Sequence, residues 1–156
     1  MVAVLALVLF WIWIFSGGPA KPNPDYLGDR AWVARAERTC RRTVDRIGQL
    51  PEASGIARAT TRAGVLDQAT EELIVMLGRL DEPPPDDAGD ARLVEAWLAD
   101  WRTYVADRRT YADELRRDPA ARFLVAEKFD DPIDRVIGTF AEVNDMAACA
   151  TPGDVG

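Results

Sequence analysis

The chain begins with an unbroken apolar run. Positions 2–15 carry only aliphatic, aromatic or alanine side chains, and no residue of segment 1–20 is charged. A helix of fourteen residues rises about 21 Å, against about 30 Å of hydrocarbon core, and the uncharged residues that follow bring the segment to the lower limit for a span. The pattern predicts a transmembrane anchor over 1–20, with Trp11 and Trp13 at a membrane interface. The alternative is a secretory signal, in which the small residues Gly18 and Ala20 mark a cleavage before position 21.

Four amphipathic segments follow the apolar run. Their apolar positions recur every three or four residues over 29–50, 57–80, 90–117 and from 131 to about 149, with proline- and glycine-rich breaks between them. No alternating strand pattern is found. The sequence therefore predicts an all-α fold: an N-terminal transmembrane or signal helix, a linker over 21–28, an antiparallel four-helix bundle over 29–150 and a flexible tail over 151–156.

The helical period also assigns the side chains that face the bundle interior. Asp29 is expected to cap the first bundle helix, and Asp131 with Pro132 to form the cap and first position of the last. The predicted inward positions are Val33, Ala36, Cys40, Val44 and Ile47; Ala59, Ala63, Leu66, Leu73, Met76, Leu77 and Leu80; Val94, Trp97, Trp101, Tyr104, Arg108, Tyr111 and Leu115; Ile133, Val136, Ile137, Phe140, Ala141 and Asn144.

One of these faces combines aromatic rings with a charge. Trp97, Trp101, Tyr104, Arg108 and Tyr111 lie on a single face of the third bundle helix, which we call the aromatic seam. Such a stripe is typical of a packed core. The alternative is a groove or partner contact, because an arginine on an apolar face needs an acid, backbone carbonyls or an anionic ligand.

A second stripe is purely basic. Arg35, Arg38, Arg42 and Arg46 follow one another at helical spacing on the first bundle helix. The stripe is interpreted as a solvated face with weak ion pairs to neighbouring acids. The alternative is a contact for anionic headgroups or an acidic partner.

The composition of the chain argues against several classes of functional site. The 156 residues have a formal charge of −7 and contain no histidine. An acidic chain of this kind is not expected to bind nucleic acid. The sequence lacks the motifs of phosphate loops and nucleophile elbows, and its two cysteines are too far apart for a zinc pair. We therefore expect no catalytic residues, no metal and no cofactor, and the protein is not predicted to be an enzyme.

The two cysteines and the basic residues disagree about the compartment of the body. Cys40 and Cys149 are the only thiols, and a single pair in an exported domain favours one disulfide bond, the alternative being two unpaired core thiols. Lysine and arginine, however, follow the apolar run and none precedes it, which would keep the body cytoplasmic. We favour an extracytoplasmic body on a single-pass anchor, or a secreted one if the leader is cleaved.

The aromatic seam and the last helix also carry a resemblance. These segments resemble small membrane-anchored helical proteins of unknown role from high-GC actinobacteria, which implies an anchored, exported, disulfide-tied bundle and brings no activity with it. The residues that carry it are Trp97, Trp101, Tyr104, Asp107, Arg108, Tyr111 and Ala112, followed by Phe140, Ala141, Asn144, Met146 and Cys149.

The expected function is that of a non-enzymatic, membrane-tethered bundle at the outer face of the cytoplasmic membrane. It would act as an interaction or accessory module, with another envelope protein as its partner. One alternative is a module that binds an amphiphile or anionic lipid through the aromatic seam. Another is an anchored accessory subunit facing the cytoplasm.

Overall fold

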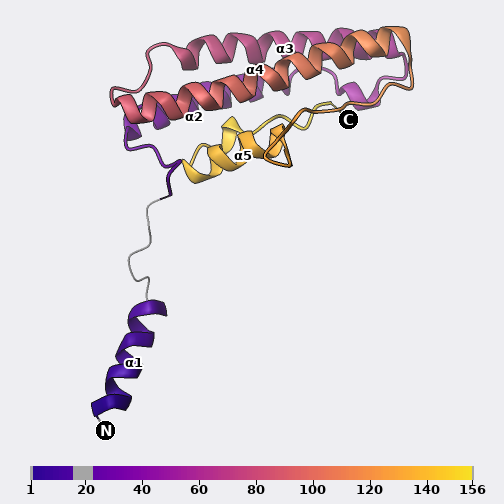
Figure 1. Cartoon of the computed structure of the whole chain (residues 1–156). Coiled ribbons are helices and arrows are strands. Elements are labelled where there is room, and N and C mark those ends of the chain that lie inside the picture. The colour runs from indigo at the N-terminus through magenta and orange to yellow at the C-terminus, as the bar shows by residue number, and fades with distance from the viewer. Residues whose placement is uncertain (1, 16–22, 156) are drawn as a thin grey trace.

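A computed structural model describes residues 2–15 and 23–155 (Figure 1). These residues form mainly helices, which confirms the all-α class. The elements are α1 (Val2–Phe15), α2 (Arg30–Ile47), α3 (Ala59–Asp81), α4 (Ala88–Arg117) and α5 (Ile133–Val143), the 3-10 turns η1 (Ala53–Gly55) and η2 (Ala147–Cys149), and the short strands β1 (Glu127–Lys128) and β2 (Asp131–Pro132).

Helix α1 covers the apolar run and stands apart from the body in Figure 1. It is apolar on all sides, and large side chains such as Leu7, Trp13 and Phe15 are exposed. In the part of the chain that the structure describes, no helix has the length and apolar character of a membrane span. Positions 1 and 16–20 of the expected anchor lie outside the described residues.

The body is a ring of four helices. In Figure 1, α3 runs antiparallel to both α2 and α4, and the shorter α5 lies below these three helices. Helix α3 packs against α2 and α4, α5 packs against α4, and η2 packs against both α5 and α2. The fourth side is therefore closed by a short helix and a 3-10 turn rather than by a full-length helix.

Buried apolar side chains fill this ring in two clusters. The main cluster draws on all four helices. The second cluster lies where α3 begins and α4 ends, and it consists of Ala53, Ala59, Ala63, Leu66, Tyr111, Ala112 and Leu115. Every predicted inward position of α3 and α4 is buried, because both helices have neighbours along their whole length.

Helix α2 matches its predicted start. The Asp29 carboxylate accepts a hydrogen bond from the backbone N–H of Trp32 at 2.9 Å, as a cap does. The helix ends at Ile47, three residues earlier than expected. The prediction that Val44 faces the core is wrong: its side chain is 40% exposed and lines a surface pocket instead.

The segment before α5 departs from the expectation of no strand. Asp131 and Pro132 pair with Glu127 and Lys128 in an antiparallel hairpin. Its two turn residues have φ of 57° and 63°, as a type I′ turn requires. Helix α5 begins at Ile133, with Pro132 at the cap position and no side-chain cap, so the predictions of Asp131 as the cap and Pro132 as the first helical residue are wrong. The Asp131 carboxylate instead accepts a hydrogen bond from the Arg135 side chain at 2.8 Å.

The last helix is shorter than predicted because a Schellman motif ends it. Asp145 has a left-handed φ of 59°, and the N–H of Met146 donates to the carbonyl of Ala141 at 2.8 Å. Helix α5 therefore stops at Val143, and Cys149 lies in the separate turn η2.

The described part of the predicted linker packs against the body. Leu27 is fully buried, and its N–H donates to Oδ1 of Asn144 at 2.8 Å. Nδ2 of Asn144 in turn donates to the carbonyl of Asp25 at 3.0 Å. One buried amide thus joins the start of the body to the end of α5.

Candidate functional site

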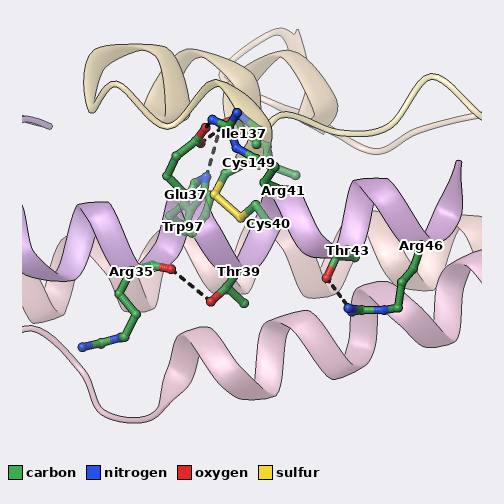
Figure 2. The surroundings of a disulfide bond; sticks show 11 residues. Arg35, Glu37, Thr39, Cys40, Arg41, Thr43, Arg46, Trp97, Ile137 and Cys149 are labelled. Atoms are coloured by element: carbon green, nitrogen blue, oxygen red, sulfur yellow. Dashed lines mark hydrogen bonds and ion pairs between the residues drawn. A yellow bond between two sulfur atoms is a disulfide. The ribbon is translucent and has the colours of Figure 1, made fainter.

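A disulfide bond joins α2 to η2, as predicted. Cys40 and Cys149 are both fully buried, their Cα atoms are 5.1 Å apart, and 109 positions separate them in the sequence. Figure 2 shows the sulfur bridge between α2 and the turn that follows α5.

Polar contacts hold the two sides of this bridge in register. One carboxylate oxygen of Glu37, a turn before Cys40 on α2, accepts a hydrogen bond from the N–H of Ala148 at 2.9 Å. The other oxygen pairs with Arg41 (Figure 2). The bridge is therefore supported by a hydrogen bond across the same interface.

The aromatic seam is packed inside the body. All five of its predicted residues are buried. Its rings contact one another, Phe123 or Phe140. Trp97 stacks on Phe140 with ring centroids 5.3 Å apart and donates from its indole N–H to the carbonyl of Ile137 at 3.2 Å. The rings of Phe123 and Tyr104 meet edge to face, with their centroids 5.9 Å apart. The seam holds α4 to α5 and to the extended segment before the hairpin.

The charge on the seam is neutralised by the end of the chain. Arg108 is fully buried, and its two terminal nitrogens donate to the two carboxylate oxygens of Asp154 at 2.6 and 2.7 Å. Its Nε donates to the hydroxyl of Thr70 at 3.0 Å. Bidentate geometry of this kind is the strongest form of an arginine–carboxylate contact.

Burial and these contacts shift the pKa values of Arg108 and of the neighbouring Tyr104. Burial alone would lower the pKa of Arg108, but the hydrogen bonds and negative charge of Asp154 outweigh it and raise that pKa. Burial raises the pKa of the Tyr104 phenol above its usual value, although the nearby cation of Arg108 acts in the opposite direction.

The basic stripe of α2 divides into two pairs. Arg35 donates to the carbonyl of Pro83, and Arg46 pairs with Glu72 at 2.5 Å. Arg38 and Arg42, one turn apart, are exposed, and neither forms an ion pair with a carboxylate in the described part of the body. The expected ion pairing thus holds at the end of the stripe and not at its centre.

Two of the depressions on the surface of the body adjoin the residues described above. One, of about 270 Å³, lies between α4, α5 and the hairpin, where Lys128 pairs with Asp100 at 2.7 Å. The other, of about 450 Å³, lies at the end of α2 and is lined by aliphatic side chains, by Glu52 and Ser54, and by the tail residues 152–154.

Sequence reasoning gave Arg108 the need for a partner but not its identity. The partner, Asp154, lies in the tail that was expected to be flexible, and Val155 beside it packs against the second cluster. A six-residue tail carries no periodic pattern that would place its acid over α4.

Comparison with protein-family models, with curated proteins and with solved structures finds no match. The resemblance to actinobacterial anchored proteins therefore stays a prediction.

Proposed function

We propose that this protein is a membrane-tethered, non-enzymatic helical module whose body lies outside the cytoplasm and binds another envelope protein. The observation that carries the proposal is α1: every side chain that the structure describes on it is exposed, and the whole helix is apolar. Such a surface needs an apolar surrounding, because leaving it in water costs about 25 cal/mol for each Å². A fourteen-residue helix is shorter than the hydrocarbon core, and bilayers accommodate short segments by local thinning.

The disulfide bond supports the extracytoplasmic location. Structural disulfides form and persist in oxidising compartments and are rare in the cytosol. The charged groups that the body brings together, such as Arg108 with Asp154 and Lys128 with Asp100, are paired with one another. This use of the charges favours a structural and interaction role over a catalytic one.

The exposed centre of the basic stripe is our proposed contact for the partner. Arg38 and Arg42 present two guanidinium groups one helical turn apart in an otherwise acidic protein. Their complement is an acidic surface on the partner, since opposite charges steer association and set specificity. Photo-cross-linking from position 38 or 42 should capture such a protein, whereas cross-linking from Arg92 on α4 should not.

The tether is tested by membrane fractionation. Leu7→Arg places a charge in the middle of α1, and Leu124→Arg places the same charge on an exposed apolar position of the body, where the leucine is 77% exposed. We expect the wild type and Leu124→Arg to sediment with membranes after alkaline extraction, and Leu7→Arg to be released. A wild type that is fully soluble, or a mature chain that begins at Lys21, would contradict the tether.

The compartment is tested by the redox state of the two cysteines in cells. Both sulfurs are buried, so the cells are quenched in acid and the protein is denatured before alkylation. An extracytoplasmic body should take up the alkylating reagent only after reduction. The single variant Cys40→Ser supplies a free thiol at Cys149 as a positive control for labelling. Two thiols that react without reduction in the wild type would place the body in the cytoplasm.

A further inference from the structure

The last residues of the chain form a strap over the bundle. This strap, residues 150–155, leaves the disulfide-bonded Cys149 and runs toward α4. No backbone hydrogen bond joins 151–155 to the rest of the described chain. The strap is held at its base by the disulfide bond and near its end by Asp154 and Val155.

Beneath the strap, the guanidinium group of Arg108 forms a site for one carboxylate, which Asp154 occupies. Arg108 offers both terminal nitrogens to Asp154 and is held from behind by Thr70, to whose hydroxyl its Nε donates. The hydroxyl of Thr70 donates in turn to the carbonyl of Leu66 at 2.6 Å. The guanidinium group is therefore held by α3 through Nε as well as by the strap through its two terminal nitrogens.

A partly apolar pocket lies next to this carboxylate site and shares Asp154 with it. Its volume is about 450 Å³, within the usual range of small-molecule sites. The strap forms one wall, and Asp154 belongs both to this wall and to the ion pair with Arg108. The aliphatic part of the lining consists of Val44, Ile47, Leu50, Ala53, Val65 and Ala69, and its polar part includes Glu52 and Ser54.

We propose that Arg108 and this pocket form a binding site for an aliphatic carboxylate, and that Asp154 occupies the carboxylate position when the strap is closed. A ligand that replaces Asp154 keeps the guanidinium group paired, which avoids the cost of a buried unpaired charge. Its hydrocarbon part enters the pocket, where Val44 now stands exposed. The disulfide bond keeps the base of the strap in place during the exchange.

This arrangement predicts competition between a tethered and a free carboxylate. Asp154 is five residues from a fixed point, so its effective concentration at Arg108 is high. Removing it should raise the affinity for a free aliphatic carboxylate by about tenfold or more. The pocket should add to the affinity, because each buried methylene group strengthens binding by about fourfold. Hexanoate should therefore bind more than about tenfold more tightly than acetate.

The experiment compares full-length wild type and Asp154→Ala in a nonionic detergent. Hexanoate, acetate and the neutral analogue hexanamide are titrated into each, and binding is followed by calorimetry and by the Tm. We expect hexanoate to raise the Tm of Asp154→Ala in a saturable way and to bind the wild type more weakly. Glu71→Ala, which removes the ion-pair partner of the exposed Arg109 instead, is the matched control and should not respond. The double variant Arg108→Met, Asp154→Ala should lose the response.

A second measurement covers the case in which Asp154→Ala does not fold by itself. Hexanoate should then raise its refolding yield from urea, and in the wild type it should speed removal of Val155 by carboxypeptidase as the strap opens. The site is refuted if hexanoate changes neither readout, if hexanamide matches hexanoate, or if the double variant still responds. Equal binding of acetate and hexanoate would refute the part played by the pocket. The outcome does not depend on the membrane tether or on the compartment of the body.

Discussion

Replacing Cys40 and Cys149 together by alanine is expected to remove a large share of the stability of the body. The bridge closes a loop across 109 positions, and the chain-entropy model gives about 4.7 kcal/mol for a loop of 100 residues. Measured losses for native disulfides are about 2 to 5 kcal/mol. Domains of this size have a free energy of unfolding of about 5 to 15 kcal/mol, so a loss of about 4.7 kcal/mol is roughly a third or more of a typical value.

The loss should be visible by tryptophan fluorescence. Trp32, Trp97 and Trp101 are buried in the body and report its unfolding in urea. We expect the double variant to lose about 2 to 5 kcal/mol and its Tm to fall by roughly 10 to 20 °C. Wild type treated with a reductant should match the variant, and the reductant should have no effect on the variant itself.

Two results would refute this reasoning. A loss below about 1 kcal/mol would mean that the ring is closed without the bridge, by η2 packing and the hydrogen bond from Ala148 to Glu37. A reductant that destabilises the double variant as much as the wild type would mean that its effect is not on the disulfide bond.

Three further predictions concern the core, the buried charge and pH. Leu66→Ala should cost about 2 to 5 kcal/mol in urea unfolding, because Leu66 is only 1% exposed. Val44→Ala should cost less than about 1 kcal/mol, because Val44 is 40% exposed, and equal losses would contradict this difference in exposure. Asp154→Ala alone should cost about 3 to 5 kcal/mol in the same assay, because it leaves the buried charge of Arg108 unpaired. The double variant with Arg108→Met should recover much of this loss. A double variant as unstable as the single one would show that the unpaired charge is not the cause. Because burial raises the pKa of Tyr104 in the folded state, stability should be lost as the pH rises from about 10 toward that higher value. In alkaline unfolding curves Tyr104→Phe should keep its stability there, and a parallel loss in wild type and variant would exclude this phenol.

Helical periodicity predicted the long elements because their neighbours are long. Along α3 and α4 each inward position meets another helix, so every predicted residue from Ala59 to Leu80 and from Val94 to Leu115 is buried. At the end of α2 the same rule failed. Val44 has the right spacing, but no helix of the described chain packs against it there. It lines the surface pocket beside the strap instead.

The remaining differences arise from short-range geometry and from long-range pairing. The turn of the hairpin uses Phe129 and Asp130 in left-handed conformations that usually favour glycine or asparagine, so the sequence carried no turn signal. Similarly, the sequence required a partner for Arg108, which could be an acid, backbone carbonyls or an anionic ligand, and it offered 26 acidic residues to choose from. Its location at Asp154 depends on where the disulfide bond directs the chain, which is a property of the whole ring.

The hydrogen bonds of Asn144 have a mechanical consequence. Because its side chain binds Leu27 and Asp25 at the same time, a force pulling the body away from α1 acts on the end of α5 as well as on α2. The end of α5 is followed by η2, and Cys149 passes the load covalently to the middle of α2. Tension along the tether is thus spread over the ring instead of unwinding α2 from its first turn. In single-molecule pulling, Asn144→Ala should yield at a lower force than the wild type, and an unchanged rupture force would show that the load takes another route.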